Sequence, residues 1–93
     1  MTAAKLNRKI IADNLRFMTI TPSMDVDFTA GELSVSIFWH EPSINVAWYP
    51  IIQIDEGDKT IYHRDGAESM GPFCTAWSKF LFDAADFLEE VTA

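Results

Sequence analysis

Residues 3–17 carry apolar and charged side chains with the period of an α-helix. At about 100° per residue, one arc of this helix holds the basic side chains: Lys5, Arg8, Lys9 and Arg16. The opposite arc holds apolar side chains: Leu6, Ile10, Ile11, Leu15, Phe17 and Met18. Thr19 to Pro22 ends the helix, because β-branched residues and the residue before a proline disfavour helical backbone. The pattern predicts an amphipathic helix that packs through its apolar arc and leaves its basic arc in water.

The period changes to two after residue 23, as expected for β-strands. Apolar residues at 24, 26 and 28 alternate with Asp25 and Asp27, and residues 33–39 alternate in the same way. These segments predict two strands joined around Ala30 and Gly31. A third apolar run, residues 44–54, is interrupted by Pro50. Because proline removes a donor from the ladder, this strand is expected to bend or bulge at Pro50 or to lie at an edge.

The remaining chain predicts a return strand and a second long helix. Residues 55–58 form a turn, 59–63 a short strand and 65–71 a loop, while Pro72 suits the first turn of a helix that runs to about Val91. Its apolar stripe comprises Phe73, Trp77, Phe80, Leu81, Ala84, Leu88 and Val91. The sum is an α+β fold over residues 1–93 as a single compact domain. It consists of an N-terminal helix, a three- to four-stranded antiparallel meander and a C-terminal helix, with both helices on one sheet face.

Phe82 departs from the pattern of the last helix. It projects from the polar side, near Asp86 and Glu89, where packing onto the sheet would not use it. One interpretation is that a loop or the first helix covers it. The other is an exposed anchor for a partner, because aromatic residues ringed by polar ones are typical of interface hot spots.

Composition favours a folded protein without disulfides. The chain of 93 residues has 48% hydrophobic and 13% aromatic residues, too many for a disordered acidic tail. A single cysteine cannot form an internal disulfide. Asp13, Asn14 and Arg16 interrupt the apolar residues near the N-terminus, so no signal peptide is expected, and no window has the length of a membrane span. These features predict a cytoplasmic protein that does not bind membranes.

Charge is sorted along the chain, which has a net charge of −7. No Lys or Arg occurs between Arg16 and Lys59, whereas seven acidic residues do. Residues 80–93 again contain acids without a base. Such a field governs partner choice and encounter rate more than fold, and it opposes direct binding to nucleic acid.

Candidate catalytic and metal-binding residues are few and scattered. Cys74 falls in the first turn of the predicted last helix, and the two histidines are His40 and His63. Nothing in their spacing brings them together, and an inert thiol is the favoured interpretation of Cys74. The acids match no calcium loop, and no glycine-rich phosphate loop or nucleophile elbow occurs. We therefore expect no enzymatic activity, no cofactor and no metal.

The sorted acids favour a protein-binding function. Carboxylates on a rigid sheet can imitate the phosphates of nucleic acid and occupy a basic groove on a DNA- or RNA-handling protein. In size and charge the chain is similar to phage and mobile-element inhibitors of the anti-CRISPR or anti-defence type, which act in the host cytoplasm. The expected contacts comprise a helix patch and a strand and turn patch: Phe82, Asp83, Asp86, Glu89 and Glu90 in the first, and Asp25, Asp27, Asp55, Glu56 and Asp58 in the second.

The alternative is a small structural or assembly subunit. The basic arc of the first helix and the acidic arc of the last are opposite in sign, so they could pair between the protomers of a symmetric homodimer. Such a dimer would also cover Phe82. Salt distinguishes the two hypotheses. Mimicry predicts that partner binding weakens steeply as the salt concentration rises, whereas a dimer centred on an aromatic residue should barely respond.

Overall fold

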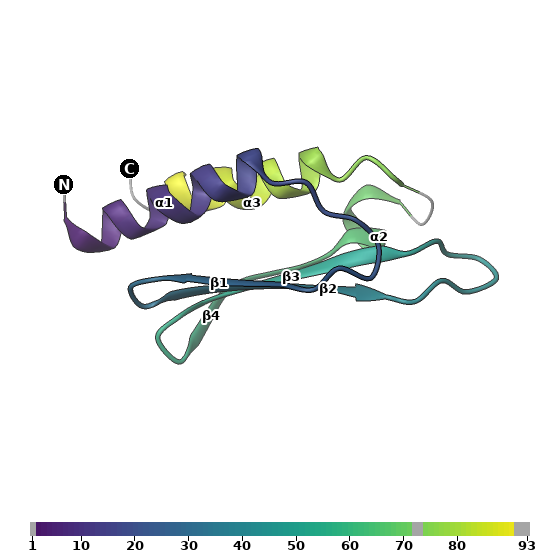
Figure 1. Cartoon of the computed structure of the whole chain (residues 1–93), viewed down its shortest axis with the longest axis horizontal. Coiled ribbons are helices and arrows are strands. Elements are labelled where there is room, and N and C mark those ends of the chain that lie inside the picture. The colour runs from purple at the N-terminus through teal and green to yellow at the C-terminus, as the bar shows by residue number, and fades with distance from the viewer. Residues whose placement is uncertain (1, 72–73, 91–93) are drawn as a thin grey trace.

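Seven elements make up the fold, a computed structural model that describes residues 2–71 and 74–90. Their bounds are α1 Ala3–Phe17, β1 Val26–Ala30, β2 Leu33–His40, β3 Tyr49–Glu56, β4 Lys59–Asp65, α2 Gly66–Met70 and α3 Ser78–Glu90. The four strands form one antiparallel sheet in the order β1-β2-β3-β4. Figure 1 shows α1 and α3 side by side over one face of this sheet. The predicted α+β fold, with both helices on one face, is confirmed.

The core lies between the sheet and the two long helices. Alternate residues of the central strands are buried towards the helices: Leu33, Val35 and Ile37 from β2, and Ile52 and Ile54 from β3. The helices contribute Ile11, Ala12, Leu15, Phe80, Leu81, Ala84, Ala85 and Leu88. Burial of these side chains is the main favourable term in forming the two layers.

α1 begins where predicted but is rotated relative to the expected orientation. Thr2 caps it, because its hydroxyl oxygen accepts from the backbone N–H of Lys5 at 3.2 Å. Leu6, Ile10 and Phe17 are 48%, 42% and 87% exposed, so the prediction that the whole apolar arc packs inward is wrong. The rotation allows part of the basic arc to form ion pairs inside the chain, as described below.

The prediction that Pro50 marks a bend, a bulge or an edge is also wrong. β3 is a central strand, and Pro50 is buried as its second residue, opposite Trp39 of β2. Pairing with β4 starts one residue later, at Ile51 and Asp65, so the missing N–H removes no bond from the β3–β4 ladder. The register shift of that ladder falls instead between Ile54 and Asp55.

The segment before the last helix differs from the predicted loop and helix. Residues 66–70 form α2, whose cap is the Asp65 carboxylate: it accepts from the backbone N–H groups of Ala67 and Glu68 at 2.8 and 3.2 Å. α3 starts at Ser78, not at Pro72, and Cys74 precedes it. The predictions made for Pro72, Phe73 and Val91 lie outside the described residues.

Candidate functional site

One face of the sheet has none of the described helices over it. α1, α2 and α3 all lie on the other side in Figure 1. In each of the four strands, alternate residues point to this uncovered face, and the strand register shows which of them are neighbours. We call this surface the outer face. Its members are Asp27, Thr29, Ser34, Ser36, Phe38, His40, Tyr49, Ile51, Gln53, Asp55, Thr60, His63 and Asp65, the last of which caps α2.

The outer face contains no Lys or Arg, although the chain has seven. Four of the seven belong to α1 and one to α3. The other two are in β4 but belong to the helix side: Lys59 is opposite Glu56, and Arg64 reaches Asp83 of α3. The sorting of charge along the sequence is therefore also a sorting in space: the Lys and Arg residues lie in the helices or on the helix side of the sheet, and Asp27 and Asp55 lie on the outer face.

Hydrogen bonds hold part of this acidic surface in place. Asp55 Oδ1 accepts from Thr60 Oγ1 at 2.6 Å and from Gln53 Nε2 at 3.2 Å. Asp27 is exposed on β1, opposite Ser36, and lies two strands and two residues away from Asp55. Standard strand dimensions put the two positions about 12 Å apart. The turn residues Glu32 and Asp58 extend the negative charge along the same end of the sheet.

Phe38 lies on the outer face, two residues along β2 from Ser36, which is opposite Asp27. It is 40% exposed and faces Ile51 across the β2–β3 ladder. One step further along the sheet, His40 stacks on Tyr49 with ring centroids 4.7 Å apart. The outer face thus combines an acidic end with an aromatic end. Sequence reasoning missed Phe38 and Glu32 as site residues, and the available signal was that Phe38 occupies the polar phase of an alternating strand.

The predicted helix patch is largely engaged within the chain. Arg16 donates to Asp86 at 2.9 Å and to Glu89 at 2.6 Å, and these bonds link α1 to α3. The hydrogen bonds that Arg16 makes with Glu89 and Asp86 raise the pKa of Arg16. The prediction that the basic arc of α1 stays in water is wrong for Arg16, because Arg16 takes the α3 carboxylates as partners. Among the described residues, no ion pair involves the remaining predicted acid of this patch, Glu90, which is exposed.

Asp83 of the helix patch and Glu56 of the strand patch also have internal partners. Asp83 accepts from Arg64 and Lys79, both at 3.0 Å. Glu56 is bound by Arg8 through contacts of 2.8 and 2.9 Å, so it belongs to the helix side and not to the outer face. Asp25 precedes β1 and is exposed. The structure thus brings Asp27 and Asp55 onto one face and separates them from Glu56 and the α3 acids.

Asp83→Asn is expected to lower the free energy of unfolding by about 1 kcal/mol at neutral pH. Burial raises the pKa of Asp83, but hydrogen bonds from Lys79 and Arg64 more than offset this, so its pKa in the folded state is lowered. The stabilisation is therefore complete above the unfolded pKa and disappears as pH falls through the folded pKa. Urea unfolding at neutral and at strongly acidic pH should show the gap between wild type and variant closing. A gap of equal size at both would contradict this assignment.

Phe82 is 42% exposed, so neither a loop nor α1 covers it fully. It belongs to α3, in the helix layer, whereas Phe38 projects from the opposite side of the sheet. The two aromatic residues therefore cannot anchor the same flat contact. Of the two, Phe38 shares its face with Asp27 and Asp55, which form no ion pair within residues 2–71 and 74–90.

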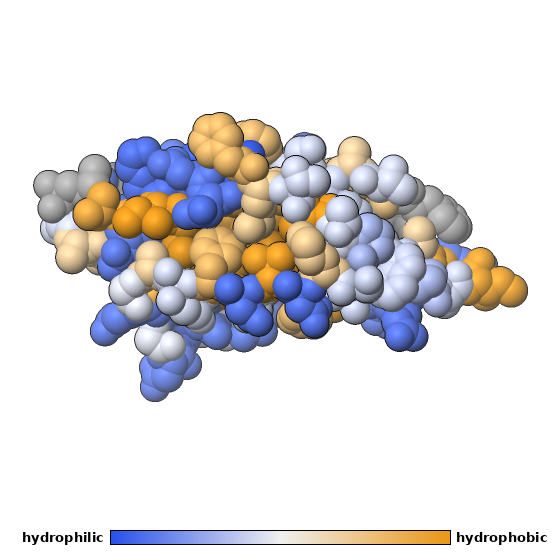
Figure 2. All heavy atoms as spheres, viewed as in Figure 1, coloured by the Kyte–Doolittle hydropathy of each residue, from blue (hydrophilic) through white to orange (hydrophobic). Residues whose placement is uncertain are grey.

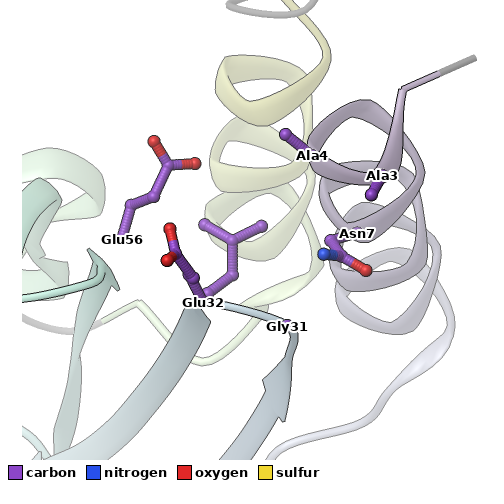
Figure 3. A pocket seen from close by; sticks show the side chains of 7 residues that line it. Ala3, Ala4, Asn7, Gly31, Glu32 and Glu56 are labelled. Atoms are coloured by element: carbon purple, nitrogen blue, oxygen red, sulfur yellow. The ribbon is translucent and has the colours of Figure 1, made fainter.

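A shallow pocket of about 340 Å³ opens where the start of α1 meets the β1–β2 turn. Figure 3 shows Glu32 and Glu56 on one side and Asn7, Ala3 and Ala4 of α1 on the other. Gly31 and Leu33 complete the lining, which contains no Cys, Ser or His. Because Arg8 already binds Glu56, the pocket offers no free pair of carboxylates for acid–base chemistry.

The candidate chemical groups elsewhere do not form a site. Cys74 directs its Sγ to the backbone carbonyl of Ala76 at 3.5 Å. His40 Nδ1 lies 2.8 Å from the carbonyl oxygen of Glu41. Within residues 2–71 and 74–90, no three His, Cys, Asp or Glu side chains are placed to hold a metal ion. None of the helices described is both long enough and apolar enough to cross a membrane.

The geometry identifies a surface, not a catalytic centre. Its defining features are the acidic and aromatic side chains of an uncovered sheet face. No family model matches this chain, and no curated protein or solved structure is significantly similar to it.

Proposed function

We propose that this chain is a non-enzymatic protein-binding domain that uses the outer face of its sheet to block a basic, nucleic-acid-handling protein. The observation that carries the proposal is the sorting of charge in space: the outer face has Asp27 and Asp55 but no Lys or Arg. Surfaces of small domains normally mix the two signs. A face of one sign attracts a partner of the opposite sign and speeds the encounter.

The mechanism is steric and electrostatic blockade. The sheet holds its carboxylates at fixed positions, and Thr60 and Gln53 restrain Asp55, so little side-chain freedom is lost on binding. Asp25 and Asp58 supply further negative charge next to this face. Phe38, exposed on the same face, anchors the contact by entering an apolar pocket of the partner. A groove filled in this way excludes the nucleic acid that it normally binds.

The setting of this activity follows the same hypothesis. The chain acts in the cytoplasm, in that of the host if a phage or another mobile element encodes it, and its target is a nuclease or a nucleic-acid-guided complex. The partly paired acids of α3, together with Phe82 and Glu90, form a second surface for a different partner. No cofactor, metal or membrane takes part.

The test is capture of partners from a host lysate at low salt, with two separate elutions. One uses a rising salt gradient and the other a short DNA or RNA duplex as competitor. Nucleic-acid mimicry predicts that the same basic protein leaves in both, because salt and duplex act on the same charged groove. A partner that resists both elutions would rule out mimicry.

Asp27→Lys is expected to weaken binding to this partner about tenfold, because reversing one contacting charge costs roughly 1.4 kcal/mol. The matched control is Glu90→Lys, which makes the same change of charge at an exposed position of α3. It should alter the affinity less than about twofold. Calorimetric titration at a fixed salt concentration measures both. The reverse order of effects would move the binding site from the outer face to the helix patch.

The alternative of a homodimer joined by oppositely charged helix arcs is weaker. Arg16, the base nearest to the acids of α3, already binds Asp86 and Glu89 of its own chain. A partner protomer would have to displace these contacts to form equivalent ones, with little net gain.

A further inference from the structure

The side of α1 nearest to β1 carries no charged residue, unlike the rest of this helix. α1 carries an uncharged stripe at spacings of four and three residues, which runs along one side of the helix. Its members are Ala3, Asn7, Ile10, Asn14 and Phe17, with Leu6 beside them. The charged residues of α1 all lie off this stripe, although a solvent-facing helix side is normally polar and charged.

This stripe is directed towards the β1 edge of the sheet. The Asn7 side chain lies against Gly31, directly after β1, and α1 covers β1 and β2. Val26, Phe28 and Ala30 of β1 are half-buried beneath it. Figure 2 shows hydrophilic side chains over much of α1 and a band of apolar side chains between α1 and the sheet. Ile10 is 42% and Leu6 48% exposed on this side.

β1 is also an unpaired edge. Within the described part of the chain it pairs with β2 alone. Ala30 and Leu33 flank a two-residue turn, and in such hairpins the flanking residues form a hydrogen-bonded pair. Because these pairs alternate, the backbone N–H and C=O groups of Asp27 and Thr29 are directed to the free edge. An exposed edge of this kind is a template for another strand.

We infer that this side binds a second copy of the chain, through antiparallel pairing of β1 with β1 and packing of α1 against α1. The register about a two-fold axis at Phe28 places Asp27 opposite Thr29 of the other copy and Val26 opposite its Ala30. An axis at Asp27 would set two carboxylates against each other, which is unfavourable. An axis at Thr29 would pair Asp27 with Gly31, a turn residue of positive φ. The sequence of β1 is thus self-complementary in one register.

The helix layer fits the same two-fold axis. α1 covers two strands, so extending the sheet across the β1 edge spaces the two α1 helices by about two strand separations, or about 10 Å, which is the usual distance of packed helices. The antiparallel α1 pair then joins uncharged stripes. This explains how a chain with a net charge of −7 can associate with itself: apart from Asp27, which faces Thr29 of the other copy, the charges lie outside the contact.

The test is the molar mass in solution, measured by sedimentation and light scattering over a range of concentrations. The expected species has about 21 kDa, twice the chain's 10.5 kDa. Its dissociation constant should change less than about twofold between about 0.1 and 1 M salt, which shortens the Debye length from about 10 to about 3 Å. A monomer at all concentrations up to about 1 mM, where association is worth roughly 4 kcal/mol, overturns the inference.

Ile10→Glu should weaken the dimer at least about 100-fold, because it places an unpaired charge in a desolvated contact. Phe82→Glu is the matched control: Phe82 has the same exposed fraction, 42%, but lies on α3. It should leave the dissociation constant within about twofold of wild type. Equal effects of the two variants would contradict the assigned interface.

Backbone hydrogen exchange supplies a second readout that needs no variant. The amides of Asp27 and Thr29 should exchange slowly in the dimer and faster on dilution, since the partner strand protects them. Thr29→Pro, which removes an outward N–H, should dissociate the dimer while circular dichroism stays unchanged. Fast exchange at both amides in a 21 kDa species, twice 10.5 kDa, would place the contact elsewhere.

Discussion

Phe80→Ala is expected to lower the free energy of unfolding by about 4 kcal/mol, the largest effect of any single truncation proposed for this chain. Phe80 is fully buried and is the largest of the fully buried side chains. It lies in the first turn of α3 and meets Trp77 edge to face, with ring centroids 5.9 Å apart. Its removal forfeits the transfer free energy of the ring, leaves a cavity between helix and sheet, and breaks the aromatic pair.

Phe82→Ala is the control for this prediction, because the same truncation two residues away removes a side chain that is 42% exposed. It should cost less than about 1 kcal/mol, since little apolar surface returns to water. Urea unfolding followed by fluorescence and circular dichroism gives both values. Similar losses from the two variants would contradict the orientation of α3.

Gly66→Ala is expected to destabilise the protein by about 2–3 kcal/mol, although alanine usually favours a helix over glycine. Gly66 starts α2 and is buried. A methyl group on its Cα would lie 2.8 Å from both Cδ and O of Pro50 and 2.9 Å from Cζ3 of Trp77. One of these atoms belongs to the backbone of a central strand, so the contact is relieved only by shifting α2 away from the sheet.

The matched control is Gly57→Ala, in the β3–β4 turn. Gly57 has a φ of 65° and nothing within 4 Å of the added methyl group, so the substitution costs only the backbone strain, about 1 kcal/mol. Thermal and urea unfolding of both variants separate the two causes. A Gly66→Ala variant as stable as wild type would show that α2 does not press on Pro50 and Trp77 in solution.

Local features of the sequence were sufficient to predict the main elements. The bounds of α1 and the β1–β2 hairpin followed from hydrophobic period and turn residues, which act over a few neighbours. α2 was missed because its cap depends on Asp65 leaving the end of β4 at a particular angle. The prediction for Pro50 was wrong because a proline fits a central strand only where its missing N–H faces no paired neighbour. That depends on where β4 stops pairing with β3, which the residues around Pro50 do not encode.

The candidate site was harder to predict because the acids differ in their distant partners. Arg8 binds Glu56, Arg16 binds Asp86 and Glu89, and Arg64 binds Asp83, across separations of 19 to 73 residues. In each case the arginine partly neutralises an acid that was predicted to contact the partner, so that acid contributes less negative charge to the surface. Asp27 and Asp55 remain on the outer face because their strands direct them away from every helix.

The element order, the α+β fold and the uneven distribution of charge follow from the sequence alone, since period and composition are properties of the chain. The folded structure was needed to show which acids are neutralised, which face of the sheet is uncovered, and which side of α1 is left beside a free strand edge. The reason is physical. Ion pairs, burial and strand edges depend on distances between residues far apart in the chain, and those distances exist only once helices and sheet have packed.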